Sequence, residues 1–315
     1  DLNTLKVIDL SDNSLATTVY TGQRPMVVEL SPDGEYAYVG NIKSNTLSVV
    51  ELDGASSSLV TSVSCGVIGV YIPFFGIRSA VKASPDGSTV LVTASFDDQL
   101  KVFDTGTNQV VASLTTGDFP LDVSFNHDGS LACVVNTFDH SYDIVSVDGA
   151  SSSVLFHEVL SCEYPVDVAY NEWEGLFYIC SANSKRIFSI DPQSGEVVET
   201  VNTPAAPFHM EFYSGIPVIQ YQGDAGNEHK IVYADDVEFI LPGSAAPFTL
   251  NEMAGIVGVP IPGPDYVSII DLGPPPFIGE NGSKRQMPVY PNPAREMIFI
   301  GGDRDYERVE IFDTH

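Results

Sequence analysis

The stretch Pro25–Asp53, PMVVELSPDGEYAYVGNIKSNTLSVVELD, decides the fold because it contains three short strands in a fixed order. Met26 to Leu30 is a short apolar run. In the turn Ser31-Pro32-Asp33-Gly34, proline presets φ and glycine accepts a conformation that a side chain would disfavour. Glu35 to Gly40 and Thr46 to Leu52 then alternate between apolar and polar residues, as half-buried strands do.

This pattern returns along the chain. The turn recurs as Ser84-Pro85-Asp86-Gly87 and as Asn126-His127-Asp128-Gly129, and DGASSS occurs at Asp53–Ser58 and again at Asp148–Ser153. We predict six full units, which begin at Pro25, Arg78, Pro120, Pro165, Pro207 and Pro247. Leu5–Leu10 and Ala16–Tyr20 match the third and fourth strands of a further, partial unit.

Four short strands in each repeat of roughly 40–50 residues are typical of a β-propeller, in which each small sheet buries its faces against its neighbours. The predicted fold class is therefore all-β, a propeller of four-stranded antiparallel blades. A β-sandwich is the alternative, but it would not explain so regular a repeat.

Three phrases resemble YVTN-type β-propeller repeats of bacterial and archaeal surface proteins: SPDGEYAYVGN at 31–41, SPDGSTVLVTASFDDQLKVFDTGTNQVV at 84–111 and IDPQSGEVVETV at 190–201. The resemblance covers about residues 1–272 and implies seven blades. It does not imply one function, because the same scaffold hosts ligand-binding proteins, surface-layer proteins and lactonases.

The C-terminal part differs in composition. Residues 273–286 are rich in proline and glycine, so we predict a linker. Residues 287–315 have two interpretations. PVYPNPA, at Pro288–Ala294, resembles the start of a sorting domain for type IX secretion. Alternatively, EMIFIGG and ERVEIFD align with strands of the repeat and would complete a closing blade. Both interpretations predict an extracellular or cell-surface protein.

Charge excludes some partners. The chain has 14 basic and 42 acidic residues, a net charge of −28, so binding of nucleic acid or anionic lipid is not expected. No apolar run is long enough to cross a bilayer. The cysteines, Cys65, Cys133, Cys162 and Cys180, lack metal-ligand spacing. Their even number permits disulfides, and burial as small apolar residues is the other possibility.

Catalytic signatures such as GxSxG and HExxH do not occur in the sequence. The turn aspartates Asp33, Asp86 and Asp128 are potential calcium ligands, but such residues usually bond to their own turn. We expect that simpler role here.

One set of polar residues occupies equivalent positions of successive first strands. Asp122, Asp167, His209 and Thr249 belong to one column, and Glu29, Lys82 and Glu211 lie one step further along. If first strands surround a central channel, these groups would meet near its mouth. They could bind a divalent cation such as Ca²⁺ or act as acid and base. A solvated polar channel lining is the alternative.

The insertion Gly66–Ile77, GVIGVYIPFFGI, is almost uncharged in an otherwise acidic chain. Its residues Val70, Tyr71, Phe74 and Phe75 could form a surface for a partner or ligand. Alternatively, the insertion folds over the channel mouth and packs its own aromatic rings.

The sequence thus predicts a non-enzymatic, secreted or cell-surface propeller that binds a protein, a glycan or a small ligand. No cofactor is expected, with the channel-mouth cation as the exception. Two alternatives stay open: a lactonase- or lyase-type enzyme that uses the channel mouth, and a structural component of a surface layer.

Overall fold

The computed structural model describes residues 3–9, 14–66, 70–72, 76–78, 80–222, 228–233, 237–242, 248–251, 256–261, 266–271 and 296–299. The chain divides into two compact units, Asp1–Asn202 and Thr203–His315. Each unit is described by itself.

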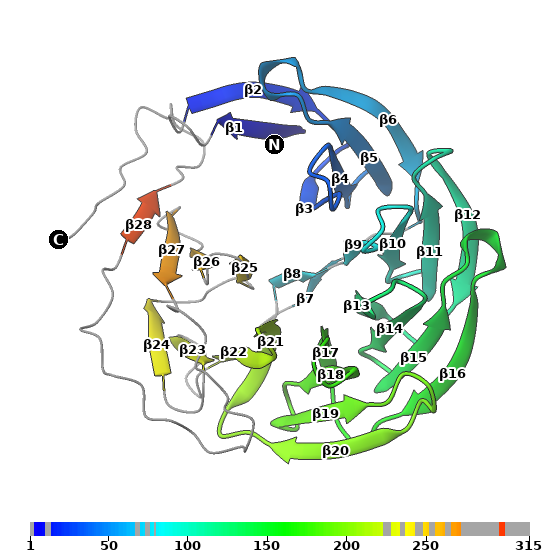
Figure 1. The fold of residues 1–315 in the computed structure, drawn as a ribbon, viewed down its shortest axis with the longest axis vertical. Coiled ribbons are helices and arrows are strands. Elements are labelled where there is room, and N and C mark those ends of the chain that lie inside the picture. The colour runs from blue at the N-terminus through cyan, green and yellow to red at the C-terminus, as the bar shows by residue number, and fades with distance from the viewer. Residues whose placement is uncertain are drawn as a thin grey trace. The chain divides into compact units, whose positions relative to one another are not determined.

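The first unit contains four antiparallel sheets whose four strands follow one another in chain order (Figure 1). The first sheet comprises β3 Pro25–Leu30, β4 Tyr36–Asn41, β5 Thr46–Glu51 and β6 Ser58–Ser64. The second comprises β9 Val81–Ala83, β10 Thr89–Ala94, β11 Gln99–Asp104 and β12 Gln109–Thr115. The third comprises β13 Pro120–Phe125, β14 Leu131–Asn136, β15 Ser141–Ser146 and β16 Ser153–Val159. The fourth comprises β17 Pro165–Asn171, β18 Leu176–Ser181, β19 Arg186–Ile190 and β20 Val197–Asn202.

The DGASSS copies have the same conformation. Each forms a single 3₁₀ turn between the third and fourth strands of its sheet, η1 at Gly54–Ser56 and η2 at Gly149–Ser151. The serine that follows each turn, Ser57 or Ser152, donates to the glycine carbonyl at 2.7 or 2.8 Å. The sequence repeat is therefore also a repeat of local structure.

The first unit also contains a two-stranded sheet, β1 Thr4–Asp9 with β2 Ser14–Tyr20. Its register shifts between Val7 and Ile8, just as the third and fourth strands of the first sheet shift between Val49 and Val50. This sheet therefore corresponds to the outer half of a four-stranded sheet, as the sequence predicted.

The second unit contains two more four-stranded sheets. One comprises β21 Ala206–Tyr213, β22 Ile216–Gln222, β23 Glu228–Tyr233 and β24 Val237–Pro242. The other comprises β25 Thr249–Asn251, β26 Ile256–Ile261, β27 Tyr266–Asp271 and β28 Glu296–Phe299. β28 pairs with β27, so part of the predicted C-terminal segment supplies a fourth strand. The rest of 273–315 lies outside the described residues, and its predicted division stays a prediction.

Buried apolar side chains fill the spaces between successive sheets. Val81, Val123 and Val168 occupy equivalent positions in the second, third and fourth sheets and are at most 5% exposed. Each belongs to a cluster formed by its own sheet and the preceding one. Val28, at the same position in the first sheet, is 50% exposed. The faces of these sheets are thus the core of the first unit.

The predicted turns are confirmed. Asp33 accepts hydrogen bonds from Ser31 Oγ at 2.5 Å and from the Glu35 amide at 3.0 Å. Asp86 makes the equivalent bonds to Ser84 Oγ and the Ser88 amide. Asp128 accepts from the Ser130 amide in the same way, but its hydroxyl donor is Ser130 Oγ, because residue 126 is asparagine. These bonds lower the pKa of all three carboxyls. The turn aspartates therefore bond within their own turns, as expected.

One predicted strand is wrong in extent. Residues 78–83 were expected to form the first strand of the second sheet, but β9 begins at Val81. Gly76–Arg78 is instead β8, which pairs with β7, Val70–Ile72, in a separate antiparallel pair; apart from Arg78, both strands belong to the 66–77 insertion. The propeller fold class is confirmed; the number of blades stays a prediction.

Candidate functional site

The predicted channel-mouth column is spread over both units. In the first unit, Asp122 on β13 accepts a hydrogen bond from the Val168 amide on β17 at 3.0 Å. Asp167 on β17 is 2% exposed. The Asp122 carboxylate therefore links the first strands of two neighbouring sheets, a role that the sequence did not suggest.

Glu29 and Glu211, which lie one step further along their strands than the column, make the same kind of link. Glu29 on β3 accepts from the Ala83 amide on β9 at 3.4 Å, and Glu211 on β21 accepts from the Leu250 amide on β25 at 3.1 Å. Lys82 lies on β9, next to Ala83, and is exposed.

His209 on β21 contacts its neighbours within the second unit. Its Nε2 lies 3.2 Å from Glu211 Oε1, and its ring meets Phe248 edge to face. Thr249 begins β25. Because Asp122 and Asp167 belong to the other unit, the convergence of the column stays a prediction. Within the described residues, no group of three or more acidic, histidine or cysteine side chains has the geometry of a metal site.

The apolar insertion is only partly described. Val70 and Tyr71 lie on β7, opposite Arg78 and Ile77 of β8. Phe74 and Phe75 lie outside the described residues. The described part of the insertion is thus a pair of antiparallel strands, and its role as a partner surface stays a prediction.

The site that emerges from the structure lies where one sheet connects to the next. The residue before the first-strand proline has a positive φ in three connections: 57° at Arg24, 63° at Phe119 and 56° at Tyr164. Positive φ is uncommon for residues other than glycine. Backbone amides of these connections donate to side chains of adjoining turns and strands, which holds the strained segment in place.

We call the connection into the first sheet the neutral junction; it comprises Asn3, Gly22, Gln23, Arg24, Ser44 and Ser48. Three consecutive amides donate there: Gly22 to Ser48 Oγ at 3.2 Å, Gln23 to Ser44 Oγ at 2.9 Å and Arg24 to Asn3 Oδ1 at 3.1 Å. All three acceptors are uncharged.

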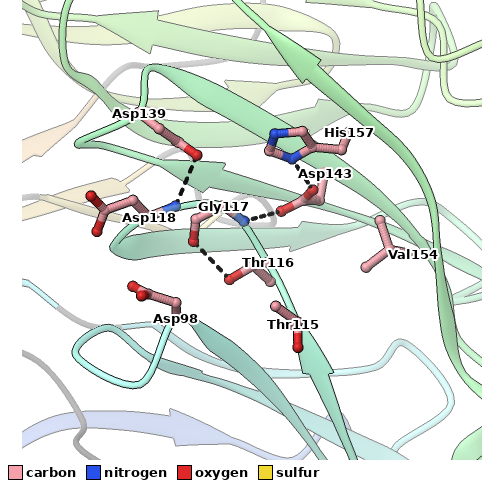
Figure 2. A pocket seen from close by; sticks show the side chains of 9 residues that line it. All are labelled: Asp98, Thr115, Thr116, Gly117, Asp118, Asp139, Asp143, Val154 and His157. Atoms are coloured by element: carbon pink, nitrogen blue, oxygen red, sulfur yellow. Dashed lines mark hydrogen bonds and ion pairs between the residues drawn. The ribbon is translucent and has the colours of Figure 1, made fainter.

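We call the connection between the second and third sheets the acidic junction; it comprises Asp98, Gly117, Asp118, Phe119, Asp139, Asp143 and His157. The equivalent three amides donate to carboxylates. Gly117 donates to Asp143 at 3.1 Å and Asp118 to Asp139 at 2.9 Å (Figure 2). Phe119 donates to Asp98 at 3.0 Å. The two junctions therefore share the pattern of hydrogen bonds but differ in the charge of the acceptor side chains.

The acidic junction forms an open pocket of about 400 Å³. Its lining includes four aspartates, His157 on β16, Thr115, Thr116 and Val154 (Figure 2). This volume lies within the range of small-molecule sites, but the lining is far more acidic than the mainly apolar lining typical of them. Its chemistry therefore suits a positively charged group.

Asp143 and His157 form a pair at one side of this pocket. Asp143 is 1% exposed and accepts from His157 Nδ1 at 2.7 Å and from Asn136 Nδ2 at 2.8 Å, in addition to Gly117. His157 is 46% exposed. The bond to Asp143 fixes the orientation of the imidazole. The cross-strand pair at this position of the first sheet is Ser48 with Ser62, so the fold does not require the Asp–His pair.

Asp118 is the exposed carboxylate of the cluster. Partial desolvation raises its pKa, and the negative charges of Asp98 and Asp139 raise it further. A carboxyl group with a raised pKa next to two others marks a place where negative charge is concentrated.

Aromatic rings border the same junction. Phe119 is 3% exposed; its ring stacks on Phe138 at 4.4 Å and meets Phe96 edge to face at 5.3 Å. Phe96 and Phe138, from the turns that also carry Asp98 and Asp139, are 54% and 47% exposed. We call Phe96, Phe119 and Phe138 the aromatic ladder. Two exposed rings thus lie next to a concentration of carboxylates.

None of the site residues predicted from the sequence lies at the acidic junction. The predicted column contains first-strand residues only, whereas the acidic junction combines two turns, one connection and the cross-strand pair Asp143–His157. The available signal was the set of turns after the second strands: IKSN, SFDD, TFDH and ANSK at 42–45, 95–98, 137–140 and 182–185. Only the middle two carry phenylalanine and aspartate.

All four cysteines are in the thiol form and buried. Burial raises the thiol pKa in Cys133 and Cys162, and in Cys65 to about 11. Such thiols are poor nucleophiles at neutral pH. Of the two possibilities left open by the sequence, burial as small apolar residues is confirmed.

The fold resembles solved structures of low sequence similarity. Hydrazine synthase of Kuenenia stuttgartiensis is 16% identical, with a TM-score of 0.62 over 79% of this chain and 77% of that chain. The β-propeller domain of Myceliophteria thermophila Cps50 (Swd1) is 12% identical, with a TM-score of 0.56 over 74% of this chain and 76% of that chain. These similarities show that the fold is a β-propeller. They do not indicate what the chain does, because one fold hosts many functions.

No protein-family model matches the sequence, and neither does any curated protein. A search of the described helices for a membrane-spanning segment finds none.

Proposed function

We propose that this chain is a non-enzymatic binding propeller that takes up a protein partner at the acidic junction. The observation that carries the proposal is the aromatic ladder, whose outer rings Phe96 and Phe138 are about half exposed beside four carboxylates. Exposed aromatic rings next to polar groups are typical of binding hot spots. A protein partner is favoured over a small ligand because the pocket is open and because the turns that carry Asp98 and Asp139 of its lining also carry the exposed rings Phe96 and Phe138.

We further propose that the protein acts outside the cytoplasm, on the cell surface or after secretion. The resemblance of its repeats to YVTN-type surface proteins supports this location, as does the resemblance of Pro288–Ala294 to a type IX sorting segment. The four buried thiols place no constraint on the compartment, because their burial protects them from oxidation.

Cross-linking on intact cells tests the binding function. The wild-type chain and the variant Phe96→Asn/Phe138→Asn would be displayed in the native envelope, cross-linked and analysed by mass spectrometry. We expect one partner to cross-link to the turns at 95–98 and 137–140 of the wild type only. Failure to cross-link any protein there, with both chains folded, would contradict the proposal.

An enzyme is the second candidate, and the Asp143–His157 pair favours it. A buried carboxylate that orients an exposed imidazole is the arrangement of a general base. A lactonase or lyase reaction at this pocket would lose most of its rate in the variant His157→Gln. Screening the wild type against a panel of lactones tests this candidate; turnover that survives His157→Gln would exclude this pair as its base.

A further inference from the structure

We infer that the partner presents an arginine or lysine side chain to the acidic junction. In this mode the cationic head lies among Asp98, Asp118 and Asp139, and its stem or guanidinium plane packs on Phe96 and Phe138. This inference rests on the proposed binding function and adds the chemistry of the partner.

The fold does not need the charges of Asp98 and Asp139. Ser44 accepts the amide hydrogen bond at the neutral junction that Asp139 accepts at the acidic junction, at the same distance of 2.9 Å. A third connection, into the fourth sheet, again uses a serine, Ser184, which accepts from the Glu163 amide at 2.7 Å. A hydroxyl therefore suffices for this structural role, and the carboxylate adds only charge.

The position of Asp98 leads to the same conclusion. The equivalent amides donate to the side chain of Asn3 before the first sheet and to that of His140 before the fourth. Each of these acceptors directly precedes a third strand, as Asp98 does. An amide oxygen or an imidazole nitrogen thus replaces the carboxylate elsewhere in the same chain.

The aromatic ladder is likewise not required by the fold. The positions of Phe96 and Phe138 are occupied by Lys43 in the first sheet and by Asn183 in the fourth, so the turn does not require an aromatic ring. Aromatic faces attract cations, and arginine in particular stacks on them. Exposed rings next to carboxylates that the fold does not need are more complementary to a cationic side chain than to an apolar or anionic one.

The crowding of carboxylates supports a cationic occupant as well. Asp118 carries a raised pKa because of desolvation and of its neighbours Asp98 and Asp139. A cation between these groups would relieve their repulsion. The chain's net charge of −28 would also attract a basic segment from a distance.

Fluorescence anisotropy with labelled synthetic peptides tests the inference on the full chain. The probe is a glycine–serine peptide with two arginines; its matched control replaces both arginines by neutral citrulline, which has nearly the same shape. We expect the arginine peptide to bind at least about fivefold more tightly than the citrulline peptide at low salt. We also expect this preference to fall between about 0.05 M and about 0.5 M NaCl, because salt screens exposed charges.

Variants taken from the chain's own repeats locate the binding. Asp98→Asn/Asp139→Ser copies the acceptors of the neutral junction, and Phe96→Asn/Phe138→Asn copies Asn183. Each should weaken arginine-peptide binding by about fivefold to tenfold. The matched charge control is Asp53→Asn/Asp148→Asn, since both aspartates are exposed and neither makes a side-chain cap to its 3₁₀ turn. This control should bind like the wild type.

The inference would be overturned by equal binding of the citrulline peptide, by equal loss in the Asp53→Asn/Asp148→Asn control, or by self-association that the Phe96→Asn/Phe138→Asn variant abolishes. Saturation of the junction by CaCl₂ alone, with displacement of the peptide, would show a metal site instead. A neutral partner cross-linked at these turns would overturn the cationic partner but leave the binding function in place.

Discussion

The neutral and acidic junctions have the same backbone and different side chains. In both, three consecutive amides before a proline donate to three side chains, at distances between 2.9 and 3.2 Å. At the neutral junction the acceptors are Ser48, Ser44 and Asn3. At the acidic junction they are Asp143, Asp139 and Asp98. The comparison separates what the propeller needs, an acceptor, from what one junction adds, negative charge.

A repeat protein thereby contains its own control. A residue that occurs at the equivalent position of another repeat already fits the same local geometry. Replacing one such residue by the other should therefore preserve the fold. The features confined to one junction, which are its charge, the Asp143–His157 pair and the exposed rings, are the ones to assign to function.

The largest expected effect comes from removing the acceptor altogether. Asp143→Ala would leave the Gly117 amide, Asn136 Nδ2 and His157 Nδ1 without their acceptor in a site where Asp143 is 1% exposed. We expect a loss of about 3 kcal/mol in the free energy of unfolding, measured by urea denaturation. Asp143→Ser, which copies Ser48, should lose less than half as much. Equal losses would show that the charge itself is structural.

The second-largest expected effect is the loss of stability when the junction glycine is replaced by alanine, and it should be equal at the two junctions. A Cβ at Gly117 would lie 2.4 Å from Ser141 Oγ and 2.5 Å from Asp139 Oδ2, and one at Gly22 would lie 2.5 Å from Ser44 Oγ and 2.6 Å from Thr46 Oγ1. Gly117→Ala and Gly22→Ala should each cost about 1–3 kcal/mol because a packed site must shift. A cost at only one junction would mean that the two schemes are not equivalent.

A smaller effect, the replacement of Asp118 by asparagine, should raise the free energy of unfolding rather than lower it. Because the pKa of Asp118 is raised in the folded state, ionisation of this group costs stability as the pH rises through its folded pKa. Asp118→Asn should therefore stabilise the protein at pH 7, by less than about 0.5 kcal/mol because the group is exposed. The gain should vanish near about pH 3, where the carboxyl is protonated in both states. Gln23 occupies the equivalent position of the neutral junction, so Gln23→Asp should show no comparable cost.

The smallest expected effects come from the turn aspartates Asp33 and Asp128, which bond within their own turns in both sheets. The pKa values of Asp33 and Asp128 are lowered, first of all by the hydroxyls of Ser31 and Ser130. Their stabilisation is present above the unfolded pKa and is lost as the pH falls through the folded pKa. Asp33→Asn and Asp128→Asn should slightly lower the melting temperature at pH 7, equally in both sheets, and the difference should disappear in acid. A pH dependence of the opposite sign would contradict the turn geometry.

Much of the fold could be predicted from the sequence because the information is local. The turn that contains Asp33 recurs, and alternation between turns marks each strand. The 70–78 hairpin was not predicted, since an uninterrupted apolar run shows no alternation from which to read strand boundaries. The partial unit at Leu5–Leu10 was predicted because its sequence matches a third strand, and the register shift at Val7 confirms the match.

The acidic junction could not be predicted in the same way. Asp98, Asp118 and Asp139 come from three segments that meet only when two sheets stack, and no single segment carries a motif. The sequence also predicts that one face of each first strand borders the channel, which stays a prediction. What it did not indicate is that Asp122 and Glu29, on that face, accept hydrogen bonds from the first strand of the next sheet.

The measurement that tests this account most directly is the free energy of unfolding of Asp98→Asn/Asp139→Ser, with arginine-peptide binding measured on the same sample. If the carboxylates are surplus to the fold, the variant should be as stable as the wild type, or slightly more stable, and should bind the arginine peptide about fivefold to tenfold more weakly. A loss of more than about 2 kcal/mol in stability, or unchanged peptide binding, would contradict the account.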